Sequence, residues 1–345
     1  MSQAVSEIAK QGGKNILNFA SKDGSFKRQA SVFRDAITRD SDKFKPEAGR
    51  YHVYISLACP WAHRVFIYLV TKGLVKGFNP KTSEISKDSI IGLSVVHWSM
   101  DEKGWRFPSE GDTTPAATQD HNYGFKRLSE LYYKANPEYD GRFTVPVVWD
   151  KKTQTIVNNE SAEIIRFLNT EFNDLIDDPE QKQLDYYPKE LQSKIDELNS
   201  WIYDNINNAV YKSGFATKQE VYESEVTNLF VHLDKVEKIL KENKAKGLRY
   251  LIGNKITEAD IRLFTTIIRF DPVYVQHFKC NIGTIRSDYP YLHDWVRDLY
   301  WNNEEIKNTV NFDHIKFHYT KSHIGINPHK ITPLGPIPHI LPLNK

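Results

Sequence analysis

The order of apolar and polar positions predicts two regions of different architecture, of which the first begins near residue 50. Residues 51–57 are rich in β-branched and aromatic side chains, which is typical of a short buried strand. From Pro60 onward, apolar residues recur at helical spacing up to Val70, and Gly73 suits the end of this helix. Residues 90–98 form a second apolar strand. A strand, helix, strand order implies that the two strands are parallel and joined by a right-handed crossover.

The same region continues with alternating helical and extended patterns. Residues 99–125 are rich in Pro, Thr and Gly and are expected to be an irregular insertion. Residues 128–133 are predicted to be helical, residues 142–150 and 155–157 to be the strands of a hairpin, and residues 158–168 to begin another helix. The resulting order of strand, helix, strand, helix, strand, strand, helix is the thioredoxin-like α/β arrangement.

The second region is predicted to be all-helical. Amphipathic patterns cover residues 191–206, 221–240 and 289–300, and the lysine-rich residues 241–246 are expected to be a link. A further helix opens with a capping box, in which Thr257 is the cap and Asp260 answers it, so Asp260 is assigned a structural role. We predict four parts: an extended N-terminal arm (1–45), a thioredoxin-like domain (46–175), an all-helical domain (176–320) and a C-terminal tail (321–345).

Composition narrows the classes of partner. The chain of 345 residues is 40% hydrophobic and 26% charged, and its net charge of +2 is too small to indicate a nucleic-acid or membrane surface. The two cysteines lack metal-ligand spacing, so neither a disulfide scaffold nor a metal site is expected. The sequence has no apolar run of membrane-spanning length, no secretory signal core and no peroxisomal tripeptide, so the reducing cytoplasm is the expected location.

Cys59 stands where the first predicted strand gives way to a helix. Pro60 falls on the first helical position, where its missing N–H costs nothing. The sulfur is therefore expected to lie near free backbone N–H groups and the positive end of the helix dipole, which favour the thiolate. The turn resembles a thioredoxin-type redox motif with Ala62 in place of the second cysteine. A monothiol needs a thiol from solution, such as glutathione, as second reactant. The alternative is that Cys59 is a buried core residue.

Two further motifs each permit two interpretations. Pro146 within residues 142–150 either is a cis-proline that frees the backbone of Val145 to bind a peptide-like ligand as an extra strand, or is a proline of an edge strand. The Glu160-Ser161 pair opens the next helix. It either binds an amino-acid zwitterion through backbone N–H groups, a hydroxyl and a carboxylate, or simply caps the helix.

These motifs together resemble a glutathione transferase, and longer strings resemble the Xi class in particular. In that superfamily the cis-proline strand holds the cysteinyl backbone of glutathione and the Glu-Ser pair holds its γ-glutamyl end. The resemblance extends from about residue 25 to about residue 336. It is carried by residues 59–64 (CPWAHR), 96–98 (VHW), 142–146 (RFTVP), 158–161 (NNES), 206–212 (INNAVYK), 269–281 (RFDPVYVQHFKCN) and 311–319 (NFDHIKFHY).

The Xi class comprises the S-glutathionyl-hydroquinone reductases, and the resemblance implies both an activity and residue roles. Cys59 would attack the glutathione sulfur of the substrate, and a second glutathione would resolve the mixed disulfide to give hydroquinone and oxidised glutathione. Tyr211 would be the proton donor, and Tyr274 and Tyr319 would line the hydroquinone side and help to keep Cys59 ionised. The residues implied to hold glutathione are Trp98, Arg142, Thr144, Val145, Glu160 and Ser161.

Other functions stay open at this stage. An omega-like thioltransferase or dehydroascorbate reductase would use the same cysteine, and a non-catalytic glutathione-fold protein would bind without turnover. The resemblance also implies a homodimer formed through the helical domain. Cys280 is expected to be a buried helix residue rather than a resolving thiol.

Overall fold

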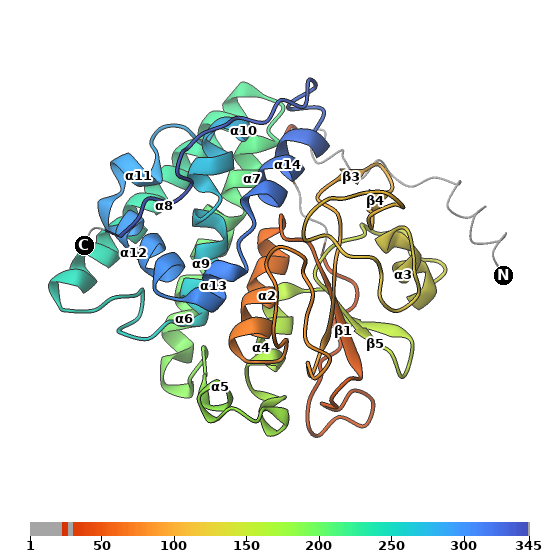
Figure 1. Ribbon diagram of the computed structural model, residues 1–345. Coiled ribbons are helices and arrows are strands. Elements are labelled where there is room, and N and C mark those ends of the chain that lie inside the picture. Colours follow the sequence, from red (N-terminus) through yellow and green to blue (C-terminus); the bar gives the residue numbers. More distant parts are fainter. Residues whose placement is uncertain (1–22, 27–29, 344–345) are drawn as a thin grey trace. The chain divides into compact units, whose positions relative to one another are not determined.

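The computed structural model describes residues 23–26 and 30–343, which form two compact units. The described residues of the first unit are 30–183 and 321–323, and those of the second are 23–26, 184–320 and 324–343. The first unit contains a mixed sheet with helices, and the second is helical (Figure 1). The predicted fold class, a thioredoxin-like α/β domain followed by an all-helical domain, is confirmed.

The four-stranded sheet of the first unit has the order β2-β1-β5-β6. Strand β1 (Tyr51–Ile55) pairs in parallel with β2 (Gly92–Val95) and antiparallel with β5 (Val147–Asp150), which forms a hairpin with β6 (Thr155–Asn158). All residues of β1 and β5 are buried, as expected for inner strands whose apolar runs are not interrupted. The predicted parallel crossover and the predicted hairpin are both confirmed.

Three longer helices accompany this sheet: α2 (Pro60–Thr71), α3 (Leu128–Ala135) and α4 (Ser161–Thr170), followed by short turns η1 (Asn173–Leu175) and α5 (Pro179–Gln183). Helices α2 and α4 pack side by side (Figure 1). Gly73 follows α2 with a φ of +66°, a left-handed conformation that favours glycine, and its N–H donates to the Val70 carbonyl at 3.0 Å. The predicted helix end is therefore confirmed.

The insertion contains structure that its composition did not indicate. A small hairpin joins β3 (Met100–Asp101) to β4 (Gly104–Trp105). The expectation of an irregular segment was wrong at this point, because strands of two residues are too short to leave a period-two pattern in the sequence.

The described part of the arm extends the sheet at the outer edge of β6. The Asp35 N–H donates to the Val157 carbonyl at 3.0 Å, and the Asn159 N–H donates to the Phe33 carbonyl at 3.1 Å. Residues 1–22 and 27–29 of the predicted arm lie outside the described residues.

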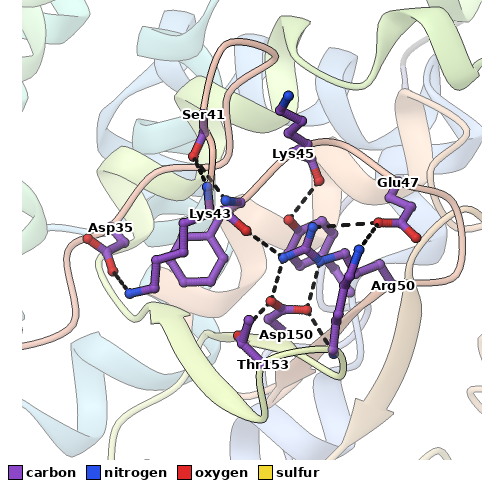
Figure 2. Close-up of polar contacts among 11 residues, drawn as sticks. Asp35, Ser41, Lys43, Lys45, Glu47, Arg50, Asp150 and Thr153 are labelled. Carbon is purple, nitrogen blue, oxygen red and sulfur yellow. Dashed lines mark hydrogen bonds and ion pairs between the residues drawn. The ribbon is translucent and has the colours of Figure 1, made fainter.

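A buried ion pair joins the start of β1 to the end of β5 (Figure 2). Arg50 donates to Asp150 through Nε at 2.9 Å and through a terminal nitrogen at 2.7 Å, and that terminal nitrogen also donates to the Lys43 carbonyl at 2.7 Å. The Thr153 hydroxyl donates to the same carboxylate at 2.6 Å. Burial alone would raise the pKa of Asp150, but these hydrogen bonds hold it below its ordinary value. The cluster fixes residues 43–50 against the sheet.

The second unit is built from helices and short helical turns. Its elements are η2 (Lys189–Leu191), α6 (Gln192–Ile202), the π-turn η3 (Tyr203–Asn207), α7 (Ala209–Gly214), α8 (Gln219–Ala245), α9 (Glu258–Ile267), the π-turn η4 (Phe270–Tyr274), α10 (Val275–His277), α11 (Ile285–Asp288), α12 (Pro290–Trp301), α13 (Glu304–Asn308) and α14 (Phe312–Ser322), the last of which ends in residues grouped with the first unit.

Two expectations for this unit change in detail. Residues 241–246 were expected to be a link, but α8 continues through them to Ala245, because Lys and Glu are good helix formers when their side chains remain in solvent. Residues 191–206 were expected to be one helix, but α6 ends at Ile202 and passes into the π-turn η3.

The predicted capping box at the start of α9 is confirmed. The Asp260 carboxylate accepts hydrogen bonds from the Thr257 N–H at 2.9 Å, the Leu251 N–H at 3.0 Å and the Trp295 indole at 3.0 Å. Burial raises the pKa of this carboxyl group. Because Asp260 connects a loop, a helix start and α12, its role is structural, as predicted.

The C-terminal tail is not helical, as predicted, in its described part from residue 323 to residue 343, where it runs through turns and bends. Its carbonyl groups accept hydrogen bonds from cationic and indole side chains of the helices, among them Lys316, Arg286 and Trp301. No helix in the described part of the chain combines the length and the apolar character that crossing a membrane requires.

Replacing Asp150 by alanine is expected to lower the free energy of unfolding by about 3–5 kcal/mol, because the buried Arg50 guanidinium then keeps only the exposed Glu47 carboxylate, 3.5 Å away, as counter-charge. Urea unfolding followed by circular dichroism measures this. Asp35→Ala is the control, since Asp35 forms an exposed ion pair with Lys43 and should cost less than about 1 kcal/mol. Equal losses in the two variants would contradict the prediction.

Acidification is expected to destabilise the protein partly through His52. Burial lowers the pKa of His52 to about 3, whereas an unfolded histidine has a pKa of 6.5. The unfolded chain therefore binds an additional proton below that pH, and stability is lost as the pH falls. Melting temperatures from about pH 7 to about pH 5 should decrease less steeply in His52→Gln than in the wild type. Parallel curves would show that His52 is not involved.

Candidate active site

Cys59 lies at the junction between β1 and α2, as predicted. It is the residue before the helix, with φ −79° and ψ 122°, and Pro60 occupies the first helical position. Its sulfur is half-buried and lies 3.6 Å from the Val145 carbonyl oxygen, to which the thiol donates. Because the Cys59 side chain is only half-buried, the alternative interpretation, in which Cys59 is a buried core residue, is not favoured.

Cys280 has a different environment. Its side chain is fully buried, and burial raises the pKa of its thiol. The predicted burial is confirmed, but the expectation of a helical position was wrong, because Cys280 follows α10 in an irregular segment.

The Val145–Pro146 peptide bond is cis and directly precedes β5. The edge-strand interpretation of Pro146 is wrong, since β5 is an inner strand of the sheet and the proline lies just outside it. Among the described residues, the Val145 N–H finds no hydrogen-bond acceptor. The Val145 carbonyl faces the Cys59 sulfur. An added peptide strand would use this carbonyl together with the Val145 N–H.

The loop before Pro146 is held by a buried phenol that the sequence analysis did not identify. The Tyr132 hydroxyl donates to the Thr144 carbonyl at 2.7 Å and accepts from the Thr144 N–H at 3.2 Å and from the Asn159 side chain at 3.1 Å. Burial raises the pKa of Tyr132 to about 12, so it remains protonated near neutral pH. The Tyr139 hydroxyl similarly donates to the Arg142 carbonyl at 2.8 Å. No local pattern in α3 could have revealed this role.

Glu160 caps α4, as one of the two interpretations of the Glu160-Ser161 pair predicts. One of its carboxylate oxygens accepts from the Ala162 N–H at 3.2 Å, and the other accepts from the Ser31 hydroxyl at 3.0 Å. Ser161 is the first residue of α4. Capping does not exclude ligand binding, because each carboxylate oxygen can accept more than one hydrogen bond.

Trp98 follows β2 and is half-buried. Because β1 and β2 are parallel, Cys59 and Trp98 both follow the same edge of the sheet. The neighbouring His97 ring, whose centroid lies 4.6 Å from that of Trp98, is bonded to the Thr114 hydroxyl of the insertion at 2.7 Å. The insertion thus supports the segment that carries Trp98.

The three tyrosines singled out from the sequence form one cluster in the second unit. The Tyr319 hydroxyl lies 2.5 Å from the Tyr211 hydroxyl and 3.1 Å from the Tyr274 hydroxyl. Tyr274 and Tyr319 are at most 1% exposed, whereas Tyr211 is half-buried. Burial raises the pKa of Tyr319 well above its ordinary value, so it remains a donor at neutral pH. The three hydroxyls thus form one hydrogen-bonded chain from Tyr274 through Tyr319 to Tyr211.

Two aromatic rings beside this cluster were not identified as site residues from the sequence. Phe26 and Phe215 stack with Tyr211 at centroid distances of 6.1 Å and 6.2 Å. These half-buried rings make the surroundings of the Tyr211 ring apolar. Such a surface suits a planar aromatic ligand.

Within residues 23–26 and 30–343, no three His, Cys, Asp or Glu side chains form a group that could hold a metal ion. The described site residues thus consist of one thiol with backbone and polar groups in the first unit, and a phenol cluster in the second.

Comparisons with known proteins agree with the predicted family. Residues 58–171 match the family model of the glutathione S-transferase N-terminal domain, and residues 219–298 match that of the C-terminal domain. Glutathione S-transferase omega-like 2 of Saccharomyces cerevisiae is 49% identical, and the alignment covers 93% of this chain and 97% of that protein.

Two further relatives carry more specific names. The glutathionyl-hydroquinone reductase YqjG of Escherichia coli is 50% identical, with 91% of this chain and 89% of that protein covered. A second match is the crystal structure of the Xi glutathione transferase ECM4 from Saccharomyces cerevisiae in complex with glutathione. Its TM-score is 0.84 and its identity 50%, and the match covers 91% of this chain and 100% of that one. The chain therefore belongs to the glutathione transferase family of enzymes, and within it to the Xi class that its sequence motifs predicted.

Proposed function

We propose that this protein uses glutathione to reduce S-glutathionyl-hydroquinones to hydroquinones. The observation that carries the proposal is the position of the Cys59 sulfur, half-buried at the start of α2 and 3.6 Å from the carbonyl of the cis-proline turn. Ala62 stands where a dithiol enzyme has its second cysteine, and Cys280 is fully buried. A mixed disulfide at Cys59 therefore needs a thiol from solution. The reductase name of the Escherichia coli relative agrees with this chemistry.

In this proposal glutathione binds along the cis-proline turn. The cysteinyl part pairs with the N–H and carbonyl of Val145, and the γ-glutamyl part binds at Glu160 and Ser161. The Glu160 carboxylate attracts the ammonium group, and the N-terminus of α4 attracts the carboxylate. The side chains of Trp98, Arg142 and Thr144 complete the glutathione site. The glutathione complex of the Saccharomyces cerevisiae relative supports this ligand.

The proposed reaction has two steps. The Cys59 thiolate attacks the sulfur of the glutathionyl-hydroquinone, an S–S bond forms, and the bond from sulfur to the ring carbon breaks. The electron pair of that bond stays on the ring carbon, which takes up a proton to give the hydroquinone. A second glutathione thiolate then attacks the mixed disulfide, giving oxidised glutathione and restoring Cys59.

Tyr211 is proposed as the acid that protonates the ring carbon. It is the half-buried member of the tyrosine cluster, and the Tyr319 hydroxyl, 2.5 Å away, can donate a hydrogen bond to the phenolate that forms. The second glutathione releases a proton when it ionises, and this proton restores Tyr211. Tyr274 and Tyr319 are also proposed to favour the ionised form of Cys59. A phenol suits this task because a charged acid would be costly in apolar surroundings.

A second candidate function follows from the name of the omega-like relative. The same cysteine could reduce mixed disulfides or dehydroascorbate, and these reactions need no proton on carbon. Rates with a glutathionyl-hydroquinone, a glutathione mixed disulfide and dehydroascorbate, measured side by side, separate the two functions.

The proposed reaction consumes reduced glutathione, so we propose that the protein acts in the cytoplasm. We also propose a homodimer formed through the helical domain, which sedimentation equilibrium would test.

Replacing Cys59 by alanine is expected to lower the turnover of a glutathionyl-hydroquinone at least about a thousandfold, because the nucleophile is lost. The melting temperature should remain near that of the wild type. Mass spectrometry of the wild type after exposure to substrate without free glutathione should find one glutathione adduct, on Cys59. Substantial activity in the alanine variant, or an adduct on Cys280 instead, would refute the proposal.

Replacing Tyr211 by phenylalanine is expected to lower kcat for a glutathionyl-hydroquinone about a hundredfold, because the acid is lost, with little change in glutathione affinity. Reduction of a mixed disulfide should be nearly unaffected, since a thiolate leaving group needs no such acid. Tyr222→Phe is the matched control, as the Tyr222 hydroxyl is bonded to the Lys279 carbonyl on the surface. Equal loss with both substrates would assign Tyr211 a binding or structural role.

A further inference from the structure

The arm residues next to the glutathione site are held in place by several contacts within the first unit. The Phe33 N–H donates to the Asn159 side-chain oxygen at 3.2 Å, in addition to the backbone bonds of residues 33 and 35 with β6 and Asn159. Arg34 forms an ion pair with Glu163 in the first turn of α4. The arm is therefore docked on the chain segment that carries Glu160.

Ser31 is the arm residue that reaches this carboxylate. Its hydroxyl lies 3.0 Å from one Glu160 carboxylate oxygen and 3.3 Å from the Asn159 carbonyl oxygen, and it is half-buried. The other Glu160 oxygen is held at 3.2 Å by the Ala162 N–H. With one donor on each oxygen, the carboxylate is fixed in its rotation while further lone pairs remain on both oxygens.

A fixed carboxylate binds a cation better than a mobile one, because less side-chain freedom is lost on binding. Resting on the proposed function, we propose that Ser31 is a positioning residue for the glutathione site, which orients Glu160 toward the ammonium group of the γ-glutamyl moiety. The N-terminal arm is then a part of the glutathione site and sets its preference for thiols that carry a γ-glutamyl group.

The test compares glutathione with cysteinylglycine, a thiol that lacks the γ-glutamyl group, by titration calorimetry on the full-length reduced protein. Ser31→Ala is expected to weaken glutathione binding about five- to tenfold, equivalent to the net contribution of one ordinary hydrogen bond, and to change cysteinylglycine binding less than about twofold. Ser31→Thr, which keeps the hydroxyl, should restore most of the affinity.

Two comparisons separate positioning from a general effect on the arm. In a Glu160→Ala background, Ser31→Ala should have almost no additional effect, because its action passes through the carboxylate. Ser41→Ala is the matched control, since the Ser41 hydroxyl accepts from the Lys43 and Phe44 N–H groups elsewhere in the arm. It should leave glutathione affinity unchanged. Melting curves verify that each variant is folded.

The outcomes distinguish this inference from the proposed function. If the wild type binds glutathione but Ser31→Ala binds it equally well, the inference fails and the proposed function stands. The inference also fails if both thiols lose affinity equally, or if the full effect persists without Glu160. If the wild type binds no glutathione at all, the proposed function fails as well.

Discussion

The junction between β1 and α2 is the constraint on which the proposed chemistry depends. Strand β1 is buried between β2 and β5, so its end point is fixed, and Pro60 fixes the first turn of the helix that follows. Cys59 lies between these two fixed elements, and its sulfur faces the carbonyl of the cis-proline turn. A thiol in this position requires no induced arrangement of the backbone before it reacts.

Most of the other groups proposed to bind glutathione lie on loops, and the hydroxyls of the buried Tyr132 and the half-buried Ser31 hold these loops in place. Tyr132 connects Thr144 to Asn159, and Ser31 connects the arm to Glu160. A loop with bonded backbone groups loses little freedom when a ligand binds, which favours affinity. The Arg50–Asp150 ion pair holds the opposite end of the sheet, where β1 begins and β5 ends, and no ligand is proposed there (Figure 2).

The three members of the tyrosine cluster differ in burial, and we propose different roles for them. Tyr274 and Tyr319 are inaccessible, and burial raises the pKa of Tyr319, whereas Tyr211 is half-buried and stacks with Phe26 and Phe215. The hydroxyl contacts permit the buried phenols to donate hydrogen bonds toward Tyr211 when it loses its proton. This arrangement suits the proposed reaction, in which an aromatic carbon is protonated.

The sequence by itself determined the features that are local. These include the helix start at Pro60, the hairpin of β5 and β6, the capping box of Asp260 and the motifs of the Xi class, because each depends on neighbouring residues or a short period. Only the tertiary structure decided which distant groups meet. Ser31 and Phe26 lie far in sequence from Glu160 and Tyr211, and Tyr132 lies 27 residues from Asn159. No pattern along the chain records a contact that packing and burial create.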